Sequence, residues 1–201
     1  MGAHQDRIEE RGPSARVGAA DGAEGEDAIL VPAWVDGALV PLGKLDVHRR
    51  GLRHKAVSVF VTAGDRLLIQ RRAPAKYHCA GLWANTCCTH PLWGEDDAAC
   101  AARRLDEELG LRGLALRPRP PIEYRAAVGG GMVEHEVVAV FAADLPAPVA
   151  PRPDPAEVDA TRWIPLDALR GEVARHPDRF TPWMRIYVAE HLDDILGTAA
   201  R

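Results

Sequence analysis

The sequence has little that suits a membrane-bound, secreted or nucleic-acid-binding protein. Among its 201 residues, no apolar run approaches the roughly eighteen needed to span a bilayer. Its first ten residues, MGAHQDRIEE, lack the charged-then-apolar order of a secretory leader. A net charge of −4 argues against a large basic surface for nucleic acid. We therefore expect a soluble, cytoplasmic protein of one domain, without nucleic-acid or membrane partners.

Cysteine is scarce and confined to one short window. The four cysteines are Cys79, Cys87, Cys88 and Cys100. The adjacent Cys87 and Cys88 are poorly placed to form a disulfide with each other, and the window lacks the CxxC spacing of thiolate zinc sites. In a reducing compartment these side chains stay thiols. We expect them to serve catalysis, metal binding or packing.

Large apolar residues are also scarce in residues 1–28, which are rich in Gly, Ala, Glu and Asp. Such a segment cannot bury enough surface to offset the entropy of ordering, so we expect a disordered tail, and a single domain over residues 29–201.

Beyond the tail, residue patterns predict strands interleaved with helices. Short turns at Gly64–Asp65 and at the triplet Gly129, Gly130 and Gly131 predict two hairpins. Interleaved elements of this kind predict a mixed α/β (α+β) sheet with helices packed on its faces. The predicted strands cover residues 28–35, 56–62, 66–71, 122–128, 132–143 and 162–164, and the helices cover 96–109, a segment from near Asp167, and a last segment capped by Thr181 with Pro182 at its first position.

The stretch NTCCTHP, residues 85–91, carries the first chemical signal. Pro91 disfavours helical geometry at His90, so the segment is expected to be extended. Residues two apart in an extended chain point the same way, which places Cys88 and His90 on one face and Cys87 on the other. Cys88 is therefore the candidate for acid–base or nucleophilic work, and Cys87 the candidate for packing.

A second signal is EHEVV, in which Glu134 and Glu136 share a strand face while His135 points away. Two neighbouring carboxylates repel each other unless a cation or a shared proton compensates, although a solvated strand face is an equally good interpretation of this segment alone. HRRGLRH adds His48 and His54, whose spacing requires a turn or irregular segment if both bind one ion. Pooled with His90, these residues suit a transition-metal or octahedral divalent site.

A third signal is the helical stretch GEDDAACAARRLDEELGL. Asp96 is expected to cap it, Ala98, Ala102, Leu105 and Leu109 to form its apolar stripe, and Gly110 to end it.

The tail of this helix, RRLDEELGL, resembles the end of a Nudix box, with Arg104 where glutamate is usual and Glu95 at the expected distance upstream. In Nudix hydrolases such helix glutamates hold magnesium against a diphosphate, so Glu107 and Glu108 are candidates. The alternative is an ordinary helix whose arginines and glutamates pair four residues apart.

Together these stretches resemble type 1 isopentenyl-diphosphate Δ-isomerases, a branch of the Nudix superfold. The resemblance runs from Val35 to about Tyr187 and rests on HRRGLRHKAVSVF, KYHCAGLWANTCCTHPLWGE, VEHEVVAVF and FTPWM. It implies a Nudix-like mixed sheet and interconversion of isopentenyl and dimethylallyl diphosphate. The reaction moves a proton across an alkene by way of a tertiary carbocation, which requires two opposed acid–base groups.

The resemblance also assigns roles by position. It implies proton transfer by Cys88 and Glu136 and a Mg²⁺, held by Glu108, that meets the substrate diphosphate. Ala84, Cys79 and Ala80 depart from the family pattern without removing any of these groups. The remaining implied residues are His48, His54, His90, Glu134 and Glu136 around one divalent Mn²⁺, Mg²⁺ or Zn²⁺ ion, the diphosphate-binding Lys44, Arg72, Lys76 and Arg104, and the aromatic Tyr124 and Trp183.

Two other functions fit parts of the sequence. A hydrolase of the same superfold would use the helix glutamates and would not need Cys88. A non-catalytic metal-binding module would keep the histidines and would not need Arg72, Lys76 and Arg104. The sequence leaves open whether the chain is a monomer or a homodimer.

Overall fold

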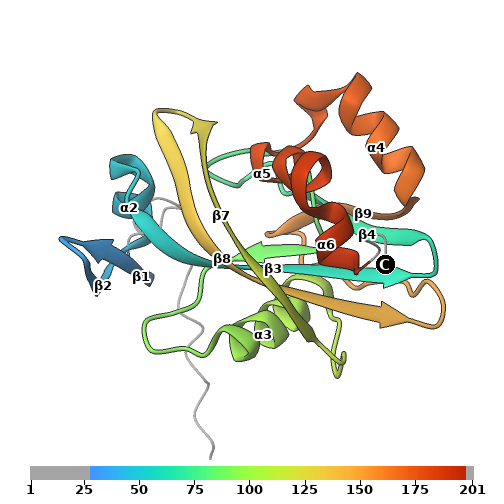
Figure 1. Cartoon of the computed structure of the whole chain (residues 1–201), viewed down its shortest axis with the longest axis horizontal. Coiled ribbons are helices and arrows are strands. Elements are labelled where there is room, and N and C mark those ends of the chain that lie inside the picture. Colours follow the sequence, from blue (N-terminus) through green and yellow to red (C-terminus); the bar gives the residue numbers. More distant parts are fainter. Residues whose placement is uncertain (1–27, 198–201) are drawn as a thin grey trace, which may run out of the picture.

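The computed structural model describes residues 28–197, so the predicted tail lies outside the described residues except for Ala28. A nine-stranded mixed sheet is covered by α3 on one face and by α4, α5 and α6 on the other (Figure 1). None of the described helices is long and apolar enough to cross a membrane. The elements are β1 Leu30–Val35, β2 Ala38–Gly43, α2 Lys44–Arg50, β3 Arg53–Ala63, β4 Arg66–Arg72, β5 Trp83–Ala84, β6 Cys87–Thr89, α3 Asp97–Leu109, β7 Arg117–Gly129, β8 Met132–Leu145, β9 Val158–Pro165, α4 Leu166–Arg175, η1 Pro177–Arg179, α5 Pro182–Ile186, η2 Tyr187–His191 and α6 Leu192–Leu196.

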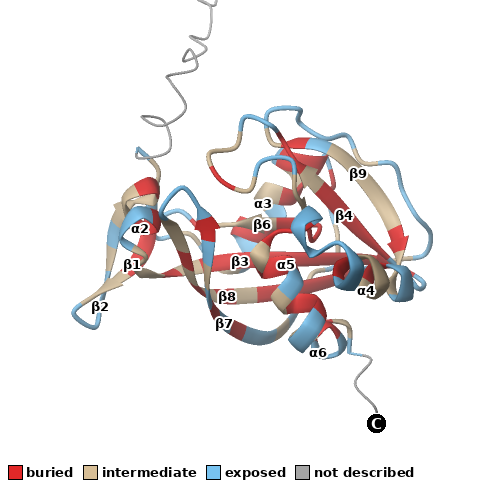
Figure 2. Cartoon of the chain, turned by 90° about the horizontal axis from the view of Figure 1, so that it is seen from above, coloured by how far each residue is buried: buried red, intermediate tan, exposed pale blue. Residues whose placement is uncertain are grey.

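Strand β3 forms the centre of the sheet because both of its faces are apolar. Ala56 and Phe60 pack in the cluster beneath α4, α5 and α6, whereas Val57, Val59 and Val61 pack toward α3. This division follows the two-residue repeat of an extended chain. Buried residues therefore gather along β3 and β4, between the two helical layers (Figure 2).

Both predicted hairpins are confirmed. β3 and β4 pair antiparallel next to the Gly64 turn, and β7 and β8 pair antiparallel around Gly130. The structure adds a parallel pairing of β3 with β8, which begins at Arg53 opposite His135 and ends at Ala63 opposite Leu145. Parallel strands need a long crossover, here the chain from β4 to β7, so local sequence gave no sign of this pairing.

Strands β3 and β4 diverge beyond their hairpin, and short strands fill the space between them. β6 pairs with β3 and β5 pairs with β4. Thr86 ties the two sides together, because its hydroxyl accepts a hydrogen bond from Val61 N and donates one to Leu68 O. This divergence opens the sheet, so that residues of α3, which covers one face, line the same pocket as residues of strand β8.

Helix α3 has the predicted ends but a different buried stripe. The Asp96 carboxylate accepts hydrogen bonds from Ala98 N and Ala99 N, and Gly110 adopts the left-handed conformation at φ 65°. The predicted stripe is wrong at Ala98 and Ala102, which are exposed. Cys100 and Ala101 are buried instead. Alanine is short enough to fit either face of a helix, so the alanine-rich sequence left the buried face of α3 ambiguous.

The remaining elements refine the sequence prediction. The last helical segment is capped by Thr181 as predicted but contains the π-helical turn η2, and α4 begins at Leu166, one residue before Asp167. Strand β9 extends the predicted segment at both ends. Strand β2 and helix α2 were not predicted, and the predicted first strand begins at Leu30.

We expect Leu105→Ala to destabilise the fold strongly, because Leu105 is 1% exposed and packs in the core between α3 and the sheet. Truncating a buried leucine typically lowers the free energy of unfolding by about 2–5 kcal/mol. Leu92→Ala is the matched control, because Leu92 is 43% exposed. Urea unfolding would measure both changes, and equal midpoints for the two variants would contradict this account of the core.

Candidate active site

One pocket gathers most of the residues that the sequence singled out. Its wall comes from α2, β4, β6, β7, β8, α3 and α5, and from the loops between β4 and β5 and before β9. His48 and His54 lie deeper, with no exposed surface. The predicted residues that line this pocket are Lys44, Arg72, Lys76, Cys88, His90, Arg104, Glu108, Tyr124, Glu134, Glu136 and Trp183.

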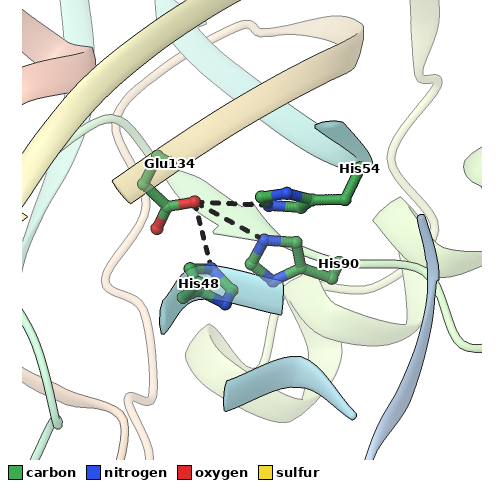
Figure 3. A group of neighbouring side chains, drawn as sticks. All are labelled: His48, His54, His90 and Glu134. Carbon is green, nitrogen blue, oxygen red and sulfur yellow. Dashed lines mark hydrogen bonds and ion pairs between the residues drawn. The ribbon is translucent and has the colours of Figure 1, made fainter. Parts of the chain in front are cut away.

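A cluster of three imidazoles surrounds the Glu134 carboxylate at the inner end of this pocket. Glu134 Oε2 lies 3.1 Å from His48 Nε2, 3.4 Å from His54 Nε2 and 3.9 Å from His90 Nε2 (Figure 3). One ligand atom from each of these four residues lies within 4.8 Å of the others. Glu136 Oε1 adds a second carboxylate at 3.1 Å from His90 Nε2.

The backbone orients two of these histidines for metal binding. His48 Nδ1 donates to Lys44 O within α2, and His54 Nδ1 donates to Leu52 O at 2.7 Å. Each donation leaves the Nε2 lone pair facing the cluster, which is the usual arrangement for histidine ligands. Among the described residues, buried His54 Nε2 has no hydrogen-bond partner. The donor set therefore fits a divalent metal ion.

Glu134 and Glu136 are both buried, but their pKa values shift in opposite directions. Burial would raise the pKa of Glu134, but interactions with the surrounding imidazoles, His48 foremost, outweigh burial and hold this pKa well below its ordinary value. For Glu136, burial and the charge of Glu134 raise the pKa well above the ordinary value. Tyr124 donates to Glu136 Oε2 at 2.5 Å. The solvated-strand alternative is therefore excluded for this face of β8, whereas His135 on the opposite face is partly exposed and contacts Glu123.

The predicted split between the two adjacent cysteines is confirmed. Cys87 is fully buried in the core beneath α3. Cys88 faces the pocket, where its thiol donates to Asn85 Oδ1 at 3.1 Å and its sulfur lies 2.8 Å from Ser58 Oγ. Burial and the nearby Glu136 carboxylate raise the pKa of the Cys88 thiol above its ordinary value, so the proton is retained at neutral pH.

The outer end of the pocket is strongly charged. Arg104 Nη2 donates to Glu108 Oε1 at 2.7 Å and contacts Glu157 Oε1 at 3.2 Å. Lys76 Nζ donates to Glu157 Oε2 at 2.5 Å. Burial would raise the pKa of Glu157, but the two cations outweigh it and lower that pKa to about 2. Cations and carboxylates thus alternate at this end of the pocket.

The two glutamates of the box differ in position. Glu108 is 4% exposed and lines the pocket, whereas the Glu107 side chain is 45% exposed and pairs with Arg103 and Arg104. Glu95 accepts from Arg103 and from Leu92 N, so it ties the loop before α3 to the helix. The Arg103–Glu107 and Arg104–Glu108 ion pairs expected of an ordinary helix are therefore present, and they coexist with the pocket.

Sequence reasoning missed several residues of this region. Glu157 follows a proline-rich connection with no motif to mark it. His78 lies within the quoted KYHCAGLW stretch but had no partner at a recognisable spacing. Gln70 donates to Glu108 Oε2 at 3.1 Å. Ser58 and Tyr187, whose oxygens are 2.9 Å apart beside Cys88, read as ordinary strand and helix residues.

Comparisons with known proteins agree with this geometry. The NUDIX domain model matches residues 52–184. The isopentenyl-diphosphate Delta-isomerase of Rhodobacter capsulatus is 58% identical over 166 residues, which covers 83% of this chain and 94% of the relative. The enzyme of that name from Dinoroseobacter shibae is 61% identical over 171 residues, covering 85% and 97%.

Solved structures share the fold at low sequence identity. A Deinococcus radiodurans protein superposes with a TM-score of 0.63 at 16% identity, covering 79% of this chain and 96% of its own. A MutT NUDIX hydrolase from Burkholderia pseudomallei gives 0.53 at 23% identity, covering 69% and 98%. From its fold and its relatives, the chain belongs to the isopentenyl-diphosphate Delta-isomerase family and has the NUDIX fold.

Proposed function

We propose that this chain interconverts isopentenyl diphosphate and dimethylallyl diphosphate by protonation and deprotonation, and so serves isoprenoid biosynthesis. The observation that carries this function is that a thiol, Cys88, and a carboxylate, Glu136, open into one buried pocket whose outer end is basic. Incubation of the purified protein with isopentenyl diphosphate tests it directly, with the dimethylallyl isomer as the expected product.

Cys88 and Glu136 are the two proton-transfer residues. One gives a proton to the alkene carbon at one end of the double bond, which forms a tertiary carbocation, and the other removes a proton from the carbon on the far side. Because the reaction is reversible, each group acts as the acid in one direction and as the base in the other. Tyr124, at 2.5 Å, holds the Glu136 carboxylate in place.

The carbocation needs electron-rich neighbours and protection from water. Trp183 is 2% exposed and lines the pocket, so its indole supplies a π face close to the reacting carbons. Burial of Cys88 and Glu136 keeps water from capturing the cation.

The basic end binds the diphosphate. Lys44, Arg72, Lys76 and Arg104 line this end, and Glu108 would hold a Mg²⁺ ion that offsets the charge of the phosphate oxygens. Arg72 Cζ lies 5.3 Å from the centre of the Trp183 ring, so the two halves of the pocket adjoin. A diphosphate anchored here places the alkene toward Cys88 and Glu136.

His48, His54, His90, Glu134 and Glu136 would hold the second divalent ion, Mn²⁺, Mg²⁺ or Zn²⁺. When bound, such a cation supplies positive charge that favours the ionised form of its carboxylate ligands. The three imidazoles contact the Glu134 carboxylate and orient it. The two-residue repeat of β8 places Glu136 on the same face.

We expect Cys88→Ala to lower isomerase kcat by about 10² to 10⁴, because a general acid–base group is lost. Cys87→Ala is the matched control and should keep most of the activity, since Cys87 packs on the opposite face of β6. Steady-state rates with isopentenyl diphosphate measure both variants. Equal losses in the two would contradict the assignment of Cys88.

We expect His90→Ala to lose the divalent ion, because one of the three imidazoles around Glu134 is removed. Elemental analysis after dialysis measures the stoichiometry, and a chelator should inactivate the wild type. The exposed His176 provides the control His176→Ala, which should keep its metal. Unchanged metal content and affinity in His90→Ala would exclude His90 as a ligand.

Arg104 separates an isomerase from a hydrolase of the same fold. Arg104→Lys should weaken substrate binding by about tenfold to a hundredfold, the value of one charge-assisted hydrogen bond. Arg104→Glu should reduce isomerisation further, because a third carboxylate would stand beside Glu108 and Glu157. It should not create hydrolysis, because Cys88 and Glu136 remain.

Isomer formation and phosphate release are measured in parallel for the wild type and both Arg104 variants. Arg103→Lys is the control, because the partners of Arg103 are Glu95, in the loop before α3, and the exposed Glu107. Phosphate release by the wild type without any isomer would falsify the isomerase proposal.

A further inference from the structure

His78 is a buried histidine beside the metal cluster to which the proposed mechanism gives no task. It lies in the loop between β4 and β5, is 7% exposed and lines the pocket. Its Nε2 is 3.1 Å from Glu134 Oε1. His48, His54 and His90 approach Oε2, the other oxygen of the same carboxylate.

The two oxygens of Glu134 therefore face different partners. Oε2 points into the three-histidine cluster, whereas Oε1 is occupied by His78. His78 is not one of the four residues whose ligand atoms lie within 4.8 Å of one another. A hydrogen bond on Oε1 restrains the carboxylate and leaves Oε2 as its single ligand atom.

We infer that His78 is a positioning residue that holds Glu134 as a monodentate ligand of the metal site. This inference rests on the metal-binding part of the proposed function. Hydrogen-bonded partners of metal ligands typically contribute 10- to 100-fold to metal affinity or activity, because they fix the ligand before the ion arrives. Without His78, Oε1 of Glu134 loses its contact, so the carboxylate is held from the Oε2 side alone and part of the binding free energy is lost in ordering it.

The surroundings of His78 fix its own ring. Its backbone oxygen accepts from Arg72 Nη2 at 3.2 Å. The ring meets Trp183 edge to face with centroids 5.9 Å apart, and meets Tyr77 in the same way at 4.4 Å. A histidine held from its main chain and from two rings directs Nε2 reproducibly at Glu134. The loop between β4 and β5 thereby connects Glu134 of the metal cluster with Arg72 at the proposed diphosphate-binding end.

Two variants separate the hydrogen bond from the packing. His78→Phe keeps a ring against Trp183 and Tyr77 but removes the donor to Glu134. His78→Gln keeps an N–H donor but removes the ring. The control is His135→Phe, because His135 neighbours Glu134 on β8, points to the opposite face and contacts Glu123.

Mn²⁺ is titrated into the metal-free full-length protein in the absence of substrate, with its dissociation constant read by competition with a chelator. We expect His78→Phe to weaken Mn²⁺ binding by about 10- to 100-fold. His78→Gln should recover part of the loss, and His135→Phe should match the wild type. Thermal unfolding of the metal-free proteins checks that all variants fold, and saturating Mn²⁺ should restore isomerase kcat in His78→Phe.

Equal Mn²⁺ affinities in the wild type and His78→Phe would overturn the inference, as would a wild type that binds no Mn²⁺. A loss as large in His78→Gln as in His78→Phe would also overturn it, because an N–H donor at this position would then recover no Mn²⁺ affinity. If His78→Phe weakens Mn²⁺ binding but the wild type forms no isomer, the role of His78 stands and the proposed function fails.

Discussion

Two carboxylates buried on one face of β8 set the constraint that the rest of the site satisfies. Glu134 and Glu136 are 2% and 5% exposed, and like charges buried this closely require compensation. Imidazoles surround Glu134, and a tyrosine hydroxyl contacts Glu136. A cation in this cluster would supply the remaining charge. Polar residues persist in this core because each has a partner or a ligand position to fill.

The parallel pairing of β3 with β8 brings these groups together. His54 lies directly opposite Glu136 in this pairing, and the turn at Gly51 returns the chain from α2 so that His48 reaches the same carboxylate face. On the other side of β3, the pairing with β6 places Cys88 opposite Ser58. Pairing with one central strand thus sets His54, Glu136 and the Cys88 thiol at fixed spacing on rigid elements.

The fold is shared with hydrolases, and the difference in chemistry lies in the side chains that the pocket receives. In a box that resembles the hydrolase motif, Arg104 replaces a glutamate and pairs with Glu108 and Glu157. Under the proposed function, that change turns one magnesium-ligand position into a phosphate-binding position. The divergence of β3 and β4 then opens the sheet so that this basic end connects with Cys88 on β6 and Glu136 on β8.

Local sequence determined the features that depend on neighbouring residues. The two-residue repeat separated Cys87 from Cys88 and placed Glu134 with Glu136, and capping preferences located the ends of α3. The resemblance to a known family added the wider set of site residues. The phase of the α3 stripe was missed because its alanines are compatible with burial and exposure alike.

Only the tertiary structure decided which distant segments meet. His78 contacts Glu134 and Glu157 contacts Arg104 across loops whose sequences carry no periodicity. Helix α2 and strand β2 were missed as well, because short elements take their stability from packing against the sheet rather than from intrinsic propensity. Periodicity and capping act over a few residues, so a sequence states which side chains share a face. The contact between two faces depends on the burial of apolar surface by the whole chain, and this sets the pairing of β3 with β8.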